Sequence, residues 1–230
     1  GASLKLMQPL GERLAALGFC VYILDLPGFG ASEPPPAAWS VPDYAKFVVA
    51  YLDAHGLARV NLFGHSFGGR LGLVLGADYP NRIVRMALAD AAGVPAPKAP
   101  TADIRLRGYK AIRDGLYKVG AKGLADDLRQ RYNARYGSAD FQAASGVLRE
   151  TFVKVVNEDL RPYARRVKAS TLLFWGDRDE DTPLWQGREL ESLIPDAGLI
   201  VYEGAGHYSY LERLNETVKT VDYFFRQGNS

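Results

Sequence analysis

Short apolar runs and longer amphipathic segments alternate along most of this chain. The apolar runs that resemble buried strands are residues 19–24, 60–63, 83–89, 171–175 and 198–202. Apolar residues recur at helical spacing in residues 4–17, 41–55, 70–79, 184–193 and 215–225. A short apolar run bounded by turn residues is typical of a strand buried on both faces. Strands that alternate with helices predict an α/β fold with a mostly parallel sheet.

This alternation breaks after Gly93. Pro95, Pro97 and Pro100 interrupt the pattern, and the residues from about 101 to 166 then show helical stretches broken by glycines, with no convincing strand. The earlier alternation resumes near residue 169. We therefore predict a core made of residues 1–93 and 169–230, with residues 94–168 as a helical insertion.

One stretch joins a strand, a turn and a helix to candidate chemistry. A predicted strand leads into a segment that fits G-x-S-x-G, with Gly64 and Gly68 on either side of Ser66. A sharp turn presses the residues around its tip together, so we expect both glycines to remove side-chain volume that would clash. The backbone N–H of Phe67 begins the helix and is predicted to stabilise an oxyanion beside Ser66.

In order along the chain, the motifs resemble those of the α/β-hydrolase family. Residues 25–32 fit D-x-x-G-x-G-x-S, residues 175–183 fit W-G-x-x-D-x-x-x-P, and His207 lies in a glycine-rich loop after the last predicted strand. The resemblance covers essentially all of residues 1–230. It implies a mostly parallel, doubly wound sheet of the α/β-hydrolase type, with residues 94–168 as a helical lid.

The resemblance also implies a catalytic triad in the chain order serine, acid, histidine. Its members are Ser66, Asp179 and His207, with Asp177 as the fallback for the acid. A serine hydroxyl is a weak nucleophile near neutral pH, so it needs a base within hydrogen-bond reach and a third group to orient that base. His65 fits the role of base less well, because its side chain is expected to point away from Ser66.

The same alignment makes Gly1 the last residue of a loop that reads H-G-x-G in the family. Three opening strands and the second oxyanion donor would then precede Gly1. The family's third strand lies between its fourth and fifth, so its loss would leave unpaired backbone groups on both sides of a gap. We therefore expect an N-terminal piece beyond the printed sequence. The alternatives are that residues 1–3 are a remnant of expression, or that the strands pair differently.

Length and composition indicate one catalytic domain. The chain has 230 residues, of which 47% are hydrophobic, and this is enough for a substantial core with an insertion. Cys20 lies in an apolar run and is predicted to be a small buried side chain. No apolar run approaches about 18 residues and no signal peptide is visible, so a cytoplasmic location is expected. His55, His65 and His207 are scattered, so no metal or cofactor is expected.

The net charge of +2 hides a difference between the insertion and the core. Residues 94–168 hold 16 Lys and Arg against 8 Asp and Glu, which gives +8 there and −6 elsewhere. These basic side chains are predicted to face solvent, since burial without acidic partners is costly. No nucleic-acid module is recognised, so the expected partner is a small molecule, not nucleic acid or a membrane. The insertion also contains aromatic residues that are expected either to line a pocket or to pack its helices against one another. They are Tyr109, Tyr117, Tyr132, Tyr136, Phe141 and Phe152.

The main functional prediction is a serine hydrolase that cleaves a small-molecule carboxylic ester through an acyl-enzyme. The same triad also suits a carbon–carbon bond hydrolase or an aminopeptidase, and the fold does not separate these reactions. A serine at the turn argues against haloalkane dehalogenases and epoxide hydrolases, which use a carboxylate nucleophile. A ligand receptor of this fold, or a non-catalytic interaction domain, is the alternative from a different class. The sequence predicts neither the substrate nor the oligomeric state.

Overall fold

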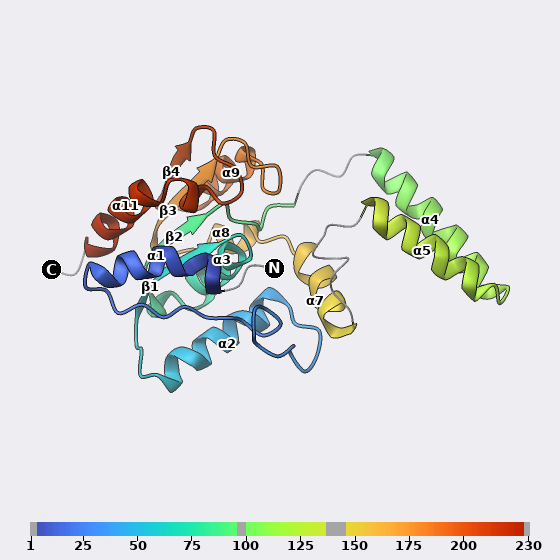
Figure 1. Cartoon of the computed structure of the whole chain (residues 1–230), viewed down its shortest axis with the longest axis horizontal. Helices are drawn as coiled ribbons and strands as arrows, with labels where there is room; N and C mark the ends of the chain where they lie inside the picture. The colour runs from blue at the N-terminus through green and yellow to red at the C-terminus, as the bar shows by residue number, and fades with distance from the viewer. Residues whose placement is uncertain (1–3, 96–99, 137–145, 228–230) are drawn as a thin grey trace.

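A four-stranded parallel sheet forms the centre of the molecule. The computed structural model describes residues 4–95, 100–136 and 146–227. Its strands lie in the order β1-β2-β3-β4 (Figure 1). They are β1 (Val60–His65), β2 (Ile83–Ala89), β3 (Ser170–Gly176) and β4 (Ala197–Tyr202). The strands predicted within these four segments are therefore confirmed, as is the parallel sheet.

Helices cover both faces of the sheet, as predicted for a doubly wound fold. One face carries α2 (Val41–Ala54), α3 (Phe67–Asp78), α8 (Arg161–Ala164) and α9 (Leu184–Leu193). The opposite face carries α1 (Leu4–Ala16), α10 (Ser209–Glu212) and α11 (Leu214–Arg226). The short 3-10 helix η1 (Pro80–Arg82) leads into β2. Each parallel strand is thus followed by a segment that returns the chain to the opposite end of the sheet.

The position of β2 inside the sheet explains why its sequence is mostly apolar. Successive side chains of a strand point to opposite faces. Met86 and Leu88 of β2 belong to the core under α2 and α3, whereas Ala87 and Ala89 belong to the core under α1 and α11. All four side chains are fully buried. A strand covered on both faces needs apolar residues at most positions, and β2 is apolar except at the half-buried Arg85.

Helix α2 begins at a capping box. The Ser40 side chain accepts a hydrogen bond from the backbone N–H of Asp43, and the Asp43 carboxylate accepts one from the Ser40 backbone N–H. These bonds satisfy two of the donors that a helix start leaves free. Farther along α2, the buried Tyr44 donates from its hydroxyl to the carbonyl oxygen of Pro27 at 2.9 Å. The helix thereby holds the loop that precedes it against the core.

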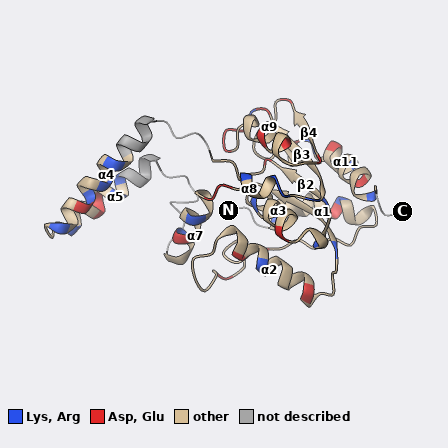
Figure 2. Ribbon diagram, turned by 180° about the vertical axis from the view of Figure 1, so that it is seen from behind, with Lys and Arg blue, Asp and Glu red and all other residues tan. Residues whose placement is uncertain are grey.

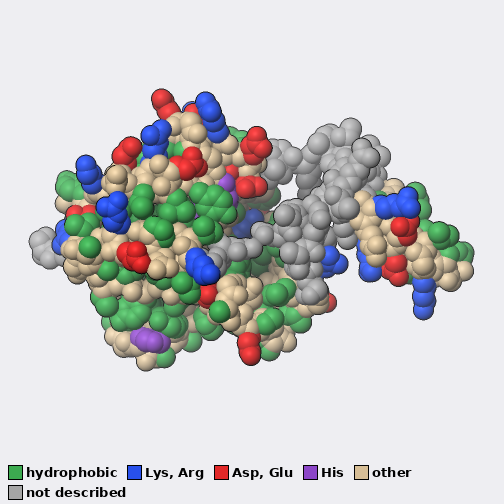
Figure 3. Space-filling model, viewed as in Figure 1, with side chains coloured by type: hydrophobic (Ala, Val, Ile, Leu, Met, Phe, Trp, Pro, Cys, Tyr) green, Lys and Arg blue, Asp and Glu red, His purple; other side chains and the backbone are tan. Residues whose placement is uncertain are grey.

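The strand predicted at residues 19–24 is wrong. This segment has no regular secondary structure, and Val21 and Tyr22 are 36% and 46% exposed. Cys20, predicted to be buried, is exposed. Among the described residues, β1 pairs only with β2. Residues 19–24 therefore have no neighbouring strand with which to form backbone hydrogen bonds. Exposed apolar side chains are also visible on the molecular surface in Figure 3.

The described residues of the insertion form three further helices between β2 and β3. They are α4 (Pro100–Lys118), α5 (Lys122–Tyr136) and α7 (Gly146–Val156). Helices α4 and α5 pack against each other and extend away from the core (Figure 1). The Tyr117 hydroxyl donates to Asp126 at 2.7 Å, so this aromatic residue joins the two helices. The side chains of Tyr132 and Tyr136, and Phe141 altogether, lie outside the described residues. The function of residues 94–168 as a lid stays a prediction.

Helix α7 contacts the core directly. The Thr151 hydroxyl accepts a hydrogen bond from the Trp39 backbone N–H at 3.2 Å. This bond joins α7 to the segment before α2.

Basic and acidic side chains both occur on α4 and α5 (Figure 2). Most of the described Lys and Arg side chains in residues 94–168 are exposed, and none of those described is buried. The predicted solvent-facing arrangement therefore agrees with the described side chains. No helix in the described ranges has the length and apolar character needed to cross a membrane.

Candidate active site

Ser66 lies at a strained turn between β1 and α3. Its backbone angles are φ 51° and ψ −105°, and a positive φ is uncommon for a residue with a side chain. The turn is fixed by hydrogen bonds on both sides of its peptide: the Ser66 N–H donates to Ala89 at 3.1 Å, and the Ala92 N–H donates to Ser66 at 3.1 Å. The end of β2 thus holds the serine in this conformation.

Close backbone contacts explain two of the glycines near the turn. A Cβ on Gly64 would lie 2.4 Å from the carbonyl oxygen of Gly68, and a Cβ on Gly69 would lie 2.3 Å from the Cβ of Ala91. A Cβ on Gly68 would meet nothing within 4 Å. The prediction that a side chain would clash is therefore confirmed at Gly64 and wrong at Gly68, and the second position that excludes a side chain is Gly69. The reason is that residue 69 faces the segment after β2, a contact between distant parts of the chain.

The backbone N–H of Phe67 is available as an oxyanion donor. Phe67 is the first residue of α3, and its N–H has no hydrogen-bond acceptor in the part of the chain that the structure describes. Its ring stacks on Phe29 at 5.1 Å and meets the edge of Tyr44 at 5.0 Å. These contacts fix the residue next to Ser66. The second donor, predicted in a loop before Gly1, lies outside the described residues.

Asp179 and His207 form a direct pair. His207 Nδ1 donates to Asp179 Oδ2 at 2.8 Å. Burial alone would lower the pKa of His207, but this bond and the Asp179 charge raise it above its usual value. Nδ1 of the imidazole is therefore directed to Asp179, and this bond does not use Nε2.

Three further donors hold the Asp179 carboxylate. The backbone N–H groups of Asp181 and Thr182 donate to Oδ1 at 2.8 and 2.9 Å, and the Thr182 hydroxyl lies 2.7 Å from Oδ2. Burial by itself would raise the pKa of Asp179, but the bonds from His207 and Thr182 outweigh it and lower the pKa. The carboxylate is thus ionised near neutral pH, as the acid of a triad must be. Sequence reasoning missed Thr182, whose contacts carry no recognisable pattern.

Asp177, the fallback acid, lies elsewhere. Its side chain is exposed and accepts a hydrogen bond from the Gly204 N–H at 2.7 Å, so it stabilises the turn after β4. Possible metal-ligating atoms of Asp179, Asp181 and His207 lie within 4.8 Å of one another. However, the Asp179–His207 hydrogen bond already uses two of these groups, and an acid–histidine pair accounts for the arrangement without a cation.

The three predicted triad residues follow three different strands at one edge of the sheet. Ser66 follows β1, Asp179 follows β3 and His207 follows β4. The Ser66 hydroxyl makes no hydrogen bond with any described residue. Catalytic hydrogen bonds commonly tighten only when substrate binds. The catalytic assignment of all three residues stays a prediction that this placement supports.

His65 contacts the histidine loop but not as a base. Its Nε2 lies 2.7 Å from the carbonyl oxygen of His207. A carbonyl oxygen only accepts, so Nε2 carries the proton. Burial lowers the pKa of His65 to about 4, which keeps the ring neutral near pH 7. Sequence reasoning did not find this contact, because it joins residues 142 positions apart.

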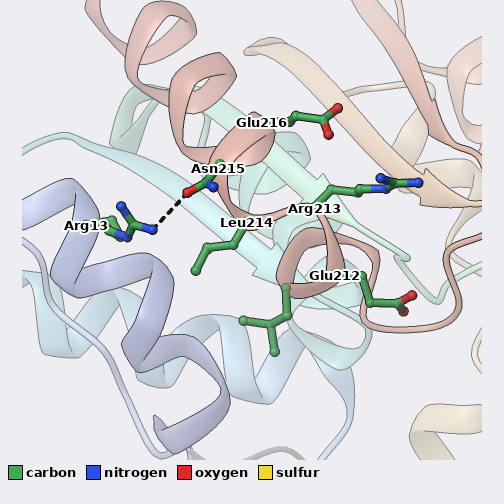
Figure 4. Close-up of a pocket in the computed structure, with 7 residues that line it drawn as sticks. Arg13, Glu212, Arg213, Leu214, Asn215 and Glu216 are labelled. Carbon is green, nitrogen blue, oxygen red and sulfur yellow. Dashed lines mark hydrogen bonds between the residues drawn. The ribbon is translucent and has the colours of Figure 1, made fainter.

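A surface hollow between α1 and α11 lies apart from these residues. Figure 4 shows it lined by side chains of both charges, with Arg13 donating to Asn215 at 2.8 Å. None of its lining residues belongs to the predicted triad. The mixed charges and the absence of a nucleophile make it a poor candidate for the active site.

Hydrolases with an α/β fold typically have a serine at a strand-to-helix turn and a histidine–acid pair that follows later strands. The residues described above have this arrangement along the chain. Comparison with known families agrees. A family model described as "alpha/beta hydrolase fold" matches residues 1–142, and one described as "TAP-like protein" matches residues 153–230. The chain therefore belongs to the α/β-hydrolase family and is an enzyme of the hydrolase class.

Several individual proteins are also similar to this chain. The chain is 26% identical to a 2-hydroxy-6-oxononadienedioate/2-hydroxy-6-oxononatrienedioate hydrolase from Burkholderia vietnamiensis, covering 94% of this chain and 80% of that one. It is 28% identical to a 2-hydroxy-6-oxo-6-phenylhexa-2,4-dienoate hydrolase from Comamonas testosteroni, covering 91% and 78%. Among solved structures, the enol-lactonase from Burkholderia xenovorans has a TM-score of 0.66 and 26% identity, covering 96% and 86%.

Proposed function

We propose that this protein hydrolyses the carbon–carbon bond beside the ketone of a small 2-hydroxy-6-oxodienoate. The relatives named as dienoate hydrolases support this reaction. They favour the carbon–carbon alternative over the carboxylic ester that was the main prediction from the sequence. Both reactions begin with attack on a carbonyl carbon, so the same serine site suits either.

The observation that carries the proposal is the 2.8 Å hydrogen bond between His207 Nδ1 and Asp179. It leaves Nε2 of His207 to remove the proton from the Ser66 hydroxyl. Ser66 then attacks the ketone carbon, and the Phe67 N–H donates to the oxyanion that forms. Asp179 stabilises the imidazolium without taking its proton.

Bond cleavage needs a proton on carbon. In the 2-keto tautomer of such a substrate, the carbon next to the 6-ketone is already protonated. When the bond between them breaks, its electron pair passes through the remaining double bond to the 2-keto oxygen, which takes the proton that His207 removed from Ser66 and so leaves His207 neutral again. The products after attack of water on the acyl-enzyme are a carboxylic acid and a 2-hydroxydienoate, so one water is consumed in each turnover. His207 activates that water as it activated Ser66.

Hydrolysis of an ester or an enol lactone is the second candidate. The likeness to the enol-lactonase structure favours it. The oxyanion chemistry is the same, but the leaving group is an oxygen and needs no protonated carbon. The two candidates therefore differ in the bond that is broken and share every catalytic group proposed here.

A substrate comparison tests the proposal. We would measure kcat/KM for 2-hydroxy-6-oxo-6-phenylhexa-2,4-dienoate, for an enol lactone and for p-nitrophenyl acetate with one enzyme preparation. The proposal expects the dienoate to have a kcat/KM at least about tenfold higher than either oxygen ester, a difference of about 1.4 kcal/mol in transition-state stabilisation.

The Ser66→Ala variant is the control for background hydrolysis in each assay. If the lactone or the ester is preferred and the dienoate is not cleaved, the carbon–carbon assignment is wrong and the second candidate replaces it. If none of the three is hydrolysed, the proposed function fails as a whole.

A further inference from the structure

Asp90 is a buried carboxylate next to the catalytic residues that the mechanism above does not use. It follows β2 directly, has a φ of 45° and is 0% exposed. A positive φ and a buried charge both cost free energy. In the described part of the chain no Lys or Arg forms an ion pair with it. Such an arrangement persists only where surrounding contacts hold it in place.

Those contacts join three loops of the site. Asp90 Oδ1 accepts from the N–H of Gly176, the last residue of β3, at 2.9 Å. Its Oδ2 accepts from both the N–H and the hydroxyl of Ser209, at 3.1 and 2.7 Å. The Thr182 hydroxyl lies 3.1 Å from the Asp90 carbonyl oxygen. The Asp90 side chain therefore links the end of β2 to the end of β3 and to the segment after His207, while its carbonyl oxygen contacts the loop that carries Asp179.

Ser209 follows His207 by two residues, so the bonds to Asp90 restrain the catalytic histidine from one side. The bond from His65 to the His207 carbonyl restrains it from the other. We propose that Asp90 is the positioning residue for His207, holding its imidazole between Asp179 and Ser66 and stabilising the imidazolium with a second negative charge. This inference rests on the proposed serine-dependent hydrolysis.

The electrostatics agree with this role. The Asp90 charge helps to raise the pKa of His207. Burial raises the pKa of Asp90 itself to about 7, against the bonds from Ser209 and Gly176. Both pKa values are therefore raised, and the charge of each group affects the titration of the other. The other titratable groups that face this pair are Asp179, Asp181, His65, Tyr202, Tyr208 and Tyr210.

The test compares Asp90→Asn with Ser209→Ala. An amide cannot accept on both sides, so Asp90→Asn removes the charge and at least one hydrogen bond. We expect kcat to fall about 10- to 100-fold with KM within about twofold, since small misplacements of a catalytic group cost that much. Ser209→Ala keeps the carboxyl group and the backbone bond and removes only the hydroxyl bond, so kcat should fall only about three- to tenfold.

Titration of His207 by proton NMR separates positioning from general destabilisation. The chain has three histidines, and His55→Gln and His65→Gln assign their signals. Loss of the Asp90 charge should lower the pKa of His207 by about half a unit or more in Asp90→Asn, whereas Ser209→Ala, which keeps the titratable carboxyl group, should lower it less. Thr217→Val is the matched control, since it removes the buried 3.0 Å bond between Thr217 and Tyr202; it should change neither kcat nor the His207 pKa.

Wild-type kcat together with an unchanged His207 pKa in Asp90→Asn would overturn the inference, as would an equal loss of kcat in Thr217→Val. If Asp90→Asn does not fold, Ser209→Ala decides: an unchanged kcat contradicts the inference. If wild-type protein hydrolyses no substrate, the proposed function fails, and the NMR titration alone still decides whether Asp90 acts on His207.

Discussion

At the scale of single residues, the contacts of two aspartates assign different roles to neighbouring positions. Asp179 accepts from His207, whereas Asp177 accepts from the Gly204 N–H and is exposed. Asp179→Asn presents an amide to the imidazole and favours the wrong tautomer, so kcat should fall about 10³- to 10⁴-fold. Asp177→Asn is the matched control and should stay within a few-fold of wild type. Steady-state kinetics on both variants would reveal a wrong assignment if the order were reversed.

His65 should make stability depend on pH. Its pKa is lowered to about 4 by burial, from an ordinary 6.5. In the unfolded chain His65 binds a proton below about pH 6.5, whereas in the folded protein it stays neutral down to about pH 4. The free energy of unfolding therefore decreases as the pH falls from about 6.5 to about 4. The loss is on the order of 3 kcal/mol. Asp90, whose pKa is raised, contributes in the opposite direction over a similar range.

A comparison of variants isolates the contribution of His65. A glutamine amide can still donate to the His207 carbonyl but does not titrate in this range. Urea unfolding of wild type and of His65→Gln at pH 7 and pH 4.5 should therefore show that the variant loses less stability on acidification. Equal losses in the two proteins would contradict the buried, neutral state of His65.

At the scale of elements, the strand-to-helix turn depends on one glycine and tolerates change at another. A Cβ on Gly64 would lie 2.4 Å from a backbone oxygen, while a Cβ on Gly68 meets nothing within 4 Å. Gly64→Ala should cost about 1–3 kcal/mol of stability and most of the activity, because the backbone cannot move aside without displacing Ser66. Gly68→Ala should leave both nearly unchanged. Denaturant unfolding and kcat/KM measure the two effects, and similar losses in both variants would count against this account of the turn.

Arg70 connects the helix after Ser66 to the end of the insertion. The buried guanidinium donates to the carbonyl oxygens of Val155 and Glu158 at 2.8 and 3.2 Å. Arg70→Met leaves both acceptors without this donor, so we expect a stability loss of about 1–3 kcal/mol and faster proteolysis between residues 146 and 168. Arg166→Met removes an exposed pair with Asp78 and should cost less than about 1 kcal/mol. Equal proteolysis rates in the two variants would contradict this anchoring role.

At the scale of the whole molecule, the sequence predicts what depends on local patterns. The four strands are mostly apolar because both faces of the sheet are covered, and the strand-to-helix turn around Ser66 has its own motif. The family motif after β3 predicts Asp179 as the acid, and the structure places its carboxylate 2.8 Å from His207 Nδ1. In each case the feature depends on residues that are close together in the sequence.

Features that depend on distant contacts were not predictable in this way. Residues 19–24 have the composition of a strand but no partner strand among the described residues. The close approach of Gly69 to Ala91, and the bonds of Asp90 to Ser209, join segments that no local pattern connects. Neither the partner of a strand nor the neighbour of a buried carboxylate can be read from composition or spacing.

The kinetics of Ser66→Ala test the central claim, that Ser66 is the nucleophile of a hydrolase, most directly. The substitution removes one oxygen and no core contact, so circular dichroism and unfolding should match wild type. On the substrate that wild type hydrolyses best, we predict a kcat/KM lower by about 10³-fold or more. A folded Ser66→Ala protein that keeps most of its activity would contradict the account.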